Sequence, residues 1–139
     1  MIIAIDFDGT CVKHCFPYVG EDIGAVPVLK KLVEKGHQLI LWTMRDHNRI
    51  DPKLKNVLTD AVNWFKENDI PLYGVNVNPT QHNWTGSPKV FANIYIDDMA
   101  LGIPLKLDTE MIGNTLTSIG RPYVDWVKVR ELLIEKDIL

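Results

Sequence analysis

The sequence predicts an α/β protein with a three-layer, Rossmann-like parallel sheet and helices on both faces. Two observations lead to this prediction. Short aliphatic runs alternate along the chain with segments whose apolar residues recur at the helical period, which is typical of strand–helix–strand units. The first aliphatic run, Ile2 to Ile5, is apolar without interruption, as expected of a parallel strand covered on both faces.

Four segments are expected to be strands of this sheet. The second of them, Gln38 to Trp42, is aliphatic like the first and ends at Thr43. A short segment further along the chain is a candidate fifth strand. The predicted strands are 2–5, 38–42, 72–77, 92–96 and, as the candidate fifth, 102–107.

Three segments between and after these strands have the apolar period of a helix. Residues 26–35 place their apolar side chains on one side and are followed by Gly36, a helix stop signal. Residues 54–68 and 124–138 show the same period. Helices that join successive strands imply right-handed crossovers and therefore a parallel sheet.

The composition fits one globular domain spanning residues 1–139, with 46% hydrophobic and 24% charged residues. A net charge of −3 gives no electrostatic footprint for nucleic acid or an anionic membrane. No apolar run reaches the length of a membrane span, and Asp6 interrupts the first run before a signal peptide could form, so we expect a cytoplasmic protein. In that compartment Cys11 and Cys15 are expected to be free thiols.

Polar residues follow three of the predicted strands at the point where each strand ends. Asp6 and Asp8 follow the first strand, Thr43 the second, and Asp97 and Asp98 the fourth. Ligands of open parallel sheets bind outside the carboxyl ends of the strands. We therefore expect these side chains to share one site.

Four aspartates at one edge would repel one another and raise each other's pKa values unless a cation joins them. Carboxylate oxygens suit Mg²⁺, which commonly bridges carboxylates to a substrate phosphate. Asp6 and Asp8 are two residues apart and would point to the same side of an extended chain, while Gly9 permits a sharp turn. One carboxylate could attack phosphorus while the other moves a proton, and Lys89 could balance the negative charge.

These motifs follow one another in a fixed order. They are Asp6-Phe7-Asp8-Gly9-Thr10, then Thr43, then Lys89 in Ser87-Pro88-Lys89, and then Asp97-Asp98. The ordered set spans residues 6 to 98 and resembles the four motifs of the haloacid dehalogenase (HAD) superfamily of phosphohydrolases. The third motif is a single basic residue, for which Lys53, Lys55 and Lys66 could compete.

The resemblance implies a phosphatase mechanism. Asp6 would be the nucleophile that forms an aspartyl-phosphate, and Asp8 would be general acid and then general base. Thr43 and Lys89 would bind the phosphoryl group. Arg45, which follows Thr43, is either a further phosphate ligand or an exposed loop residue.

The resemblance also implies a Mg²⁺ site. Asp6, the backbone carbonyl of Asp8, Asp97 and Asp98 would hold the metal. Which of Asp97 and Asp98 contacts it directly is left open by the sequence.

The spacing of the motifs leaves no room for a cap domain at the two places where larger members of the superfamily insert one. Residues 11–37 provide one loop and one helix, and residues 76–89 only a loop. A capless member is therefore expected, and a homodimer is worth testing. The sequence leaves the substrate open among sugar phosphates, nucleotides, phosphorylated protein and nucleic-acid ends. A phosphorylated small molecule is favoured, the acidic pI disfavours nucleic acid, and no membrane partner is expected. Loops 11–24 and 76–88, which carry His14, Tyr18, His82 and Trp84, are candidates for the rim of the site.

Two other functions remain open. A signalling module could accept phosphate without turnover, as response-regulator receivers do, but in those the acceptor aspartate lies on a middle strand and the lysine comes last. Here Lys89 precedes Asp97, and Thr43 stands where that acceptor would be. The other alternative is a non-catalytic HAD-like binding protein.

Overall fold

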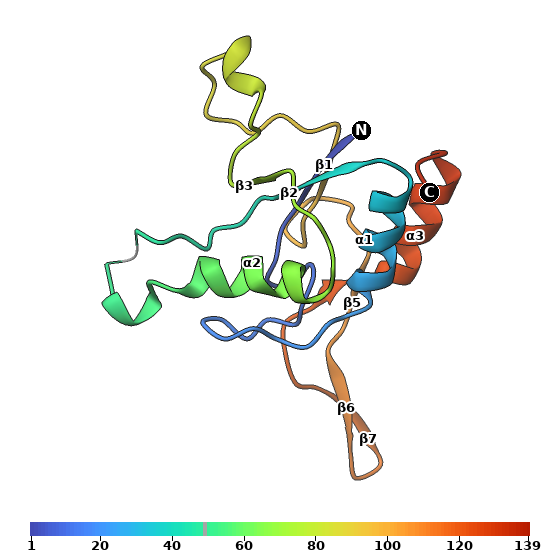
Figure 1. Ribbon diagram of the computed structural model, residues 1–139. Coiled ribbons are helices and arrows are strands. Elements are labelled where there is room, and N and C mark those ends of the chain that lie inside the picture. The colour runs from blue at the N-terminus through green and yellow to red at the C-terminus, as the bar shows by residue number, and fades with distance from the viewer. Residues whose placement is uncertain (49) are drawn as a thin grey trace.

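The computed structural model describes residues 1–48 and 50–139 (Figure 1). Within them, a four-stranded parallel sheet has the strand order β3-β2-β1-β4. Its strands are β1 (Ile2–Ile5), β2 (Gln38–Leu41), β3 (Gly74–Val75) and β4 (Ile94–Ile96). The predicted α/β, Rossmann-like parallel sheet is confirmed.

Strand β1 lies between two parallel neighbours. Ile5 stands opposite Leu41 of β2 and opposite Ile96 of β4. The side chains of Ile3, Ala4 and Ile5 are buried, as the uninterrupted apolar run predicts. Residues that follow β1, β2 and β4 therefore leave the sheet at the same edge.

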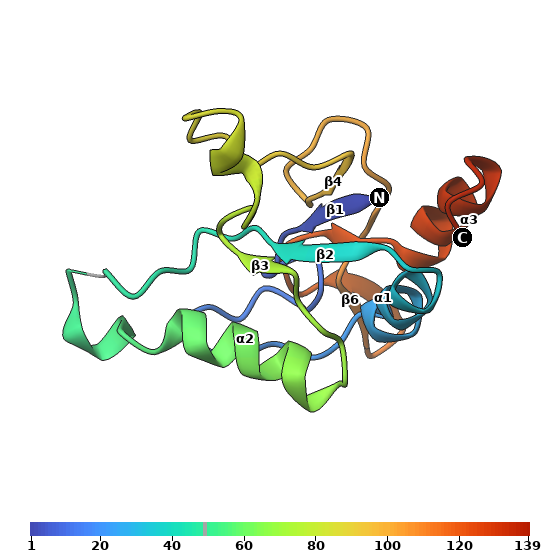
Figure 2. The ribbon, with the colours of Figure 1, turned by 45° about the horizontal axis from the view of Figure 1, so that its top comes forward.

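Helices flank this sheet. They are α1 (Ala25–Glu34), α2 (Val57–Glu67) and α3 (Trp126–Glu135), with short 3₁₀ turns η1 (Pro52–Leu54) and η2 (Gln81–Asn83). Figure 2 shows α1 and α2 along one side of the sheet, because the connections from β1 to β2 and from β2 to β3 step in the same direction with the same handedness. No helix in the described ranges is long and apolar enough to cross a membrane.

The buried core joins the sheet to α1, α2 and α3. Phe7, two residues after β1, packs edge-on against Trp64 of α2, with ring centroids 5.6 Å apart. Leu29 and Leu32 of α1 and Val129 of α3 belong to the same buried cluster. Asp6 is thus anchored by the buried side chains of Ile5 and Phe7 on either side of it in the sequence, and Asp97 by the buried Ile96 before it.

The segment between β4 and α3 departs from the sequence prediction. The candidate fifth strand exists only as β5 (Leu105–Lys106), and it pairs antiparallel with β8 (Tyr123–Val124) rather than joining the parallel sheet. Between them, β6 (Thr109–Ile112) and β7 (Thr115–Ser118) form a hairpin that the sequence analysis did not predict. Figure 1 shows this hairpin projecting from the side opposite to η2.

Candidate functional site

Three predicted metal ligands meet at the carboxyl edge of the sheet. Carboxylate oxygens of Asp6, Asp97 and Asp98 all lie within 4.8 Å of one another. The sheet register produces this arrangement, because Ile5 and Ile96 are paired and the next residue of each strand is an aspartate. The backbone N–H of Asp6 donates to the carbonyl of Ile96 at 3.0 Å and extends the pairing.

The acidic cluster has the electrostatics of a cation site. Burial raises the pKa of Asp6 to about 7, and the charges of Asp97 and Asp98 add to this effect, while hydrogen bonds from the Phe7 backbone and the Thr10 side chain oppose it. Burial and the charge of Asp97 also raise the pKa of Asp98. A divalent cation would remove the repulsion, and three carboxylates are the donor set that suits Mg²⁺.

Thr10 links the first motif to the fourth. Its buried hydroxyl donates to Asp6 Oδ2 at 3.0 Å and accepts from the backbone N–H of Asp98 at 3.0 Å. Its carbonyl accepts from the indole N–H of Trp126 at 2.6 Å. No role was predicted for Thr10, although its place within the first motif was a signal.

Gly9 makes the turn that the sequence predicts, with φ of +80°. A Cβ atom here would clash with the His14 imidazole and lie 2.8 Å from Asp98 Oδ2. His14 Nε2 is 3.1 Å from that same Asp98 oxygen, although the two are not aligned for a hydrogen bond. The absent side chain therefore allows the loop after β1 to close over the acidic cluster.

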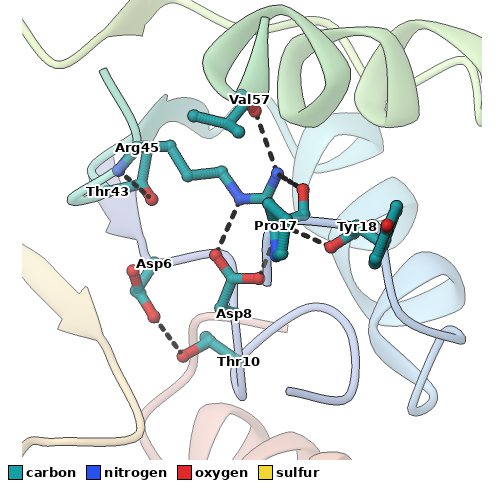
Figure 3. Close-up of polar contacts among 8 residues, drawn as sticks. All are labelled: Asp6, Asp8, Thr10, Pro17, Tyr18, Thr43, Arg45 and Val57. Carbon is teal, nitrogen blue, oxygen red and sulfur yellow. Dashed lines mark hydrogen bonds and ion pairs between the residues drawn. The ribbon is translucent and has the colours of Figure 1, made fainter. Parts of the chain in front are cut away.

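Asp8 is bound by Arg45 rather than standing free (Figure 3). Arg45 Nε donates to Asp8 Oδ2 and Nη2 donates to Asp8 Oδ1, both at 2.7 Å. The remaining guanidinium hydrogens go to the carbonyls of Val57 at 3.0 Å, Tyr18 at 2.8 Å and Pro17 at 3.4 Å. All five N–H donors of Arg45 thus have protein acceptors.

This arrangement changes the expected role of Arg45. Its side chain is 1% exposed, so it is not an exposed loop residue, and it has no donor left for a substrate phosphate. The guanidinium also lies 4.9 Å from the ring centre of Phe7 and 5.3 Å from that of Phe16, positions that favour a cation over aromatic faces. The structure therefore makes Arg45 the partner of Asp8.

Thr43 lies beside the acidic residues, at the end of β2. Its backbone N–H donates to the Asn76 side chain at 2.8 Å, and its hydroxyl oxygen accepts from the backbone N–H of Arg45 at 3.2 Å. The backbone N–H of Thr43 is therefore not available to a phosphate. The hydroxyl hydrogen of Thr43 is not used in these two bonds.

A cavity of about 380 Å³ brings most of the predicted site residues together. It is open to solvent and acidic. Its lining residues are Asp6, Asp8, His14, Phe16, Thr43, Met44, Asp97, Asp98, Met99 and Arg121. No role was predicted for Met99 and Arg121 from the sequence.

Lys89 lies outside this cavity. Its ammonium group stands 5.7 Å from the ring centre of Tyr95. Four residues later, the side chain and backbone of Asn93 pair with the backbone of Ile2, at the amino end of β1. The chain around Lys89 thus runs along the end of the sheet opposite to the acidic cluster.

Only one of the two candidate rim loops contributes to the cavity. Loop 11–24 supplies His14 and Phe16, whereas no residue of loop 76–88 lines it. Loop 76–88 is instead organised around Gln81, whose amide donates to the carbonyls of Ser87 and Lys89. Of the two thiols, Cys11 is buried and Cys15 exposed, and both are free.

A comparison with solved structures finds a conserved protein from Bacteroides thetaiotaomicron. It is 32% identical to this chain, with 98% of this chain and 91% of that chain covered and a TM-score of 0.68. The chain belongs to the family of that protein. No model of a protein family matches the sequence, and the search of curated proteins gives no match. A function for this chain therefore has to be inferred from the residues that line its cavity.

Proposed function

We propose that the protein is a Mg²⁺-dependent phosphatase that hydrolyses a phosphate monoester through an aspartyl-phosphate on Asp6. The observation that carries the proposal is the cluster of Asp6, Asp97 and Asp98, which lines a solvent-open cavity at the carboxyl edge of the sheet. The ordered resemblance to the HAD motifs supports the same function. The size and openness of the cavity suit a phosphorylated small molecule.

In the proposed reaction an Asp6 oxygen attacks phosphorus, and the bond between phosphorus and the leaving oxygen breaks as that oxygen takes a proton from the carboxyl group of Asp8. Water then hydrolyses the aspartyl-phosphate, which restores the Asp6 carboxylate and releases inorganic phosphate. Asp8 lines the same cavity and has carboxylate lone pairs beyond the two that accept from Arg45, so it can take the proton of the attacking water. The Thr43 hydroxyl is placed to donate to a phosphoryl oxygen.

Asp6, Asp97 and Asp98 would hold the metal. When bound, Mg²⁺ would supply positive charge for the phosphoryl oxygens and make the three adjacent carboxylates compatible in their ionised forms. The raised pKa of Asp6 supports this assignment, since a nucleophilic carboxylate at neutral pH requires a cation beside it. Lys89 is given no role here because its ammonium group lies over Tyr95.

A second candidate is a phosphate-accepting module that turns over slowly. The observation that favours it is the Asp8–Arg45 pair, in which each Asp8 oxygen already accepts an N–H, so that protonation of Asp8 has to compete with the guanidinium. Weak proton transfer by Asp8 would leave the phosphorylated Asp6 long-lived. Both candidates share the nucleophile and the metal site.

The decisive experiment measures hydrolysis of para-nitrophenyl phosphate in MgCl₂ and in EDTA. The wild-type protein should be active only with Mg²⁺, and Asp6→Asn should be inactive. Asp60→Asn, which changes an exposed acid in the first turn of α2, is the matched control and should keep full activity. Equal activity of Asp6→Asn and wild type would refute the nucleophile.

The same proteins separate the two candidates. After loading with acetyl phosphate, a phosphatase should lose its phosphoryl group within the turnover time, whereas a signalling module should keep it long enough to isolate. Mass spectrometry of acid-quenched protein measures this lifetime. Phosphorylation that persists in the wild type, without release of para-nitrophenol, would favour the second candidate.

A further inference from the structure

The cavity lacks an evident partner for the negative charge of a phosphate. Asp6, Asp8, Asp97 and Asp98 all line it. Among the described lining residues, the only basic side chains are His14 and Arg121. His14 Nε2 already lies 3.1 Å from an Asp98 oxygen. Arg121 is the permanently charged side chain of the two, and its charge acts on Asp98 by lowering the pKa of that carboxyl.

The two cations expected from the sequence do not fill this role in the structure. Every N–H of Arg45 is directed to a protein oxygen, and Lys89 lies over Tyr95 outside the cavity. A phosphate monoester that approaches three adjacent carboxylates needs protein donors in addition to a metal ion. Arg121 is the side chain that can provide them.

The β6–β7 hairpin fixes the position of Arg121. At the base of the hairpin, Ile119 N–H donates to the Asp108 carbonyl at 2.9 Å, and Asp108 Oδ1 accepts from Lys13 Nζ at 2.8 Å. Beyond Arg121, Val124 N–H of β8 donates to the Gly9 carbonyl at 2.9 Å. Arg121 is therefore held between two attachments to the loop that follows β1.

The guanidinium of Arg121 keeps most of its hydrogen-bonding capacity. Its Nη2 atom donates to the thioether of Met99 at 3.9 Å, a weak neutral acceptor. Met99 directly follows Asp98, so this contact places the guanidinium at the edge of the acidic cluster. The side chain is also exposed and can turn towards a ligand.

We propose that Arg121, delivered by the β6–β7 hairpin, binds the phosphoryl oxygens of the substrate. This inference rests on the proposed function, which it deepens by assigning the phosphate-binding cation to the segment after the fourth motif. The planar guanidinium presents paired N–H donors that match two phosphate oxygens. The hairpin is then part of the binding site and not only a surface extension.

Binding of inorganic phosphate tests the assignment without requiring turnover. Isothermal titration with phosphate in MgCl₂ should show binding to the wild type that is about 10- to 100-fold weaker in Arg121→Ala, as expected for loss of a charge-assisted hydrogen bond. Arg121→Lys should recover part of the affinity. Arg130→Ala, which changes an exposed arginine on α3 outside this cavity, should bind like the wild type.

The outcomes distinguish this assignment from the proposed function. If the wild type binds phosphate and Arg121→Ala does not, the assignment stands even when para-nitrophenyl phosphate is not hydrolysed. If the wild type hydrolyses the ester and Arg121→Ala has unchanged phosphate affinity and KM, the assignment is wrong while the phosphatase stands. Wild-type protein that binds no phosphate, or a Lys89→Ala variant that alone loses it, would also overturn the role of Arg121.

Discussion

Asp8 and Arg45 form a bidentate ion pair in which Nε to Oδ2 and Nη2 to Oδ1 are both 2.7 Å. The pair joins the loop after β1 to the segment after β2, and it also reaches the first residue of α2 through the Val57 carbonyl. One buried guanidinium thereby positions an acidic side chain of the cavity and holds three segments together. The function of Asp8 and the stability of the fold depend on the same contact.

Removing Arg45 should therefore destabilise the protein as well as inactivate it. Arg45→Ala leaves Asp8 without its partner and removes the guanidinium donor from three carbonyls, so we expect the free energy of unfolding to fall by about 3–5 kcal/mol. Arg45→Lys should recover little, because an ammonium group cannot form two parallel bonds to one carboxylate and still reach Val57. Urea unfolding followed by circular dichroism measures both variants.

The double variant Arg45→Ala/Asp8→Ala provides the control for this prediction. Because the partners are in contact, their losses should not add, and the double variant should be more stable than the sum of the single losses implies. Strict additivity would mean that the ion pair does not couple the two residues in solution.

Gly9→Ala should be much more damaging than another glycine replacement with the same backbone angle. Gly9 and Gly36 have φ of +80° and +84°, but a Cβ at Gly36 meets nothing within 4 Å, whereas at Gly9 it meets His14 and Asp98. Gly36→Ala should cost about 1–2 kcal/mol of stability for the left-handed backbone. Gly9→Ala should cost the same backbone strain and, in addition, the free energy needed to move His14 and Asp98 away from the new methyl group. Because Asp98 has to move, Mg²⁺ binding should also weaken.

Calorimetric titration with Mg²⁺ and thermal unfolding of both alanine variants measure these effects. Gly36→Ala should bind Mg²⁺ like the wild type. Equal losses of stability and unchanged Mg²⁺ affinity in both variants would show that the crowding at Gly9 is relieved at no cost.

The parallel sheet could be predicted because its signal is local. Buried parallel strands such as Ile2–Ile5 are aliphatic throughout, and the residue that ends each strand marks the functional edge. The β6–β7 hairpin was missed because Thr109–Ile112 and Thr115–Ser118 are largely exposed and have no apolar face towards the core. The Gly113-Asn114 pair between them, a turn signal for a two-residue hairpin loop, was the available evidence.

The site was predictable only where the sheet itself positions the residues. Asp6 and Asp97 each follow a paired strand residue, so their proximity follows from strand pairing. Arg45, Lys89 and Arg121 are carried by irregular segments, and their side chains are long enough to serve several roles. Whether such a residue enters the cavity depends on long-range contacts, such as the ion pair with Asp8, which one sequence does not reveal.

The stability of the metal-free protein should fall as the pH rises from about 4 to about 7. The pKa of Asp6 is 3.8 in the unfolded chain and about 7 in the fold, so between these values the native state keeps a proton that the unfolded state releases. The total loss from this group is on the order of 4 kcal/mol. In EDTA at pH 8, Asp6→Asn should therefore be more stable than the wild type, and at pH 4 the two should be equal.

Mg²⁺ should reverse this order at pH 8. It stabilises the wild type by mass action and should stabilise Asp6→Asn far less, because one of its carboxylates is gone. Urea unfolding at pH 4, 6 and 8, in EDTA and in MgCl₂, measures both effects. A wild-type stability that is flat across this range in EDTA would contradict the raised pKa of Asp6.

Thr10→Val should break the link between Asp6 and Asp98 in the acidic cluster, whereas Thr10→Ser should keep that link. The Thr10 hydroxyl donates to Asp6 Oδ2 and accepts from the Asp98 backbone N–H, so valine, which has nearly the same shape, leaves both groups without their partner. We expect Thr10→Val to lose about 2–3 kcal/mol of stability and at least tenfold in Mg²⁺ affinity, because Asp6 and Asp98 are no longer held together.

Thr10→Ser keeps the hydroxyl and should lose only the packing of one methyl group, about 1 kcal/mol, with Mg²⁺ affinity unchanged. Thermal unfolding and Mg²⁺ titration of the two variants decide between a hydroxyl that organises the site and a side chain that only fills space, in which case valine would behave better than serine.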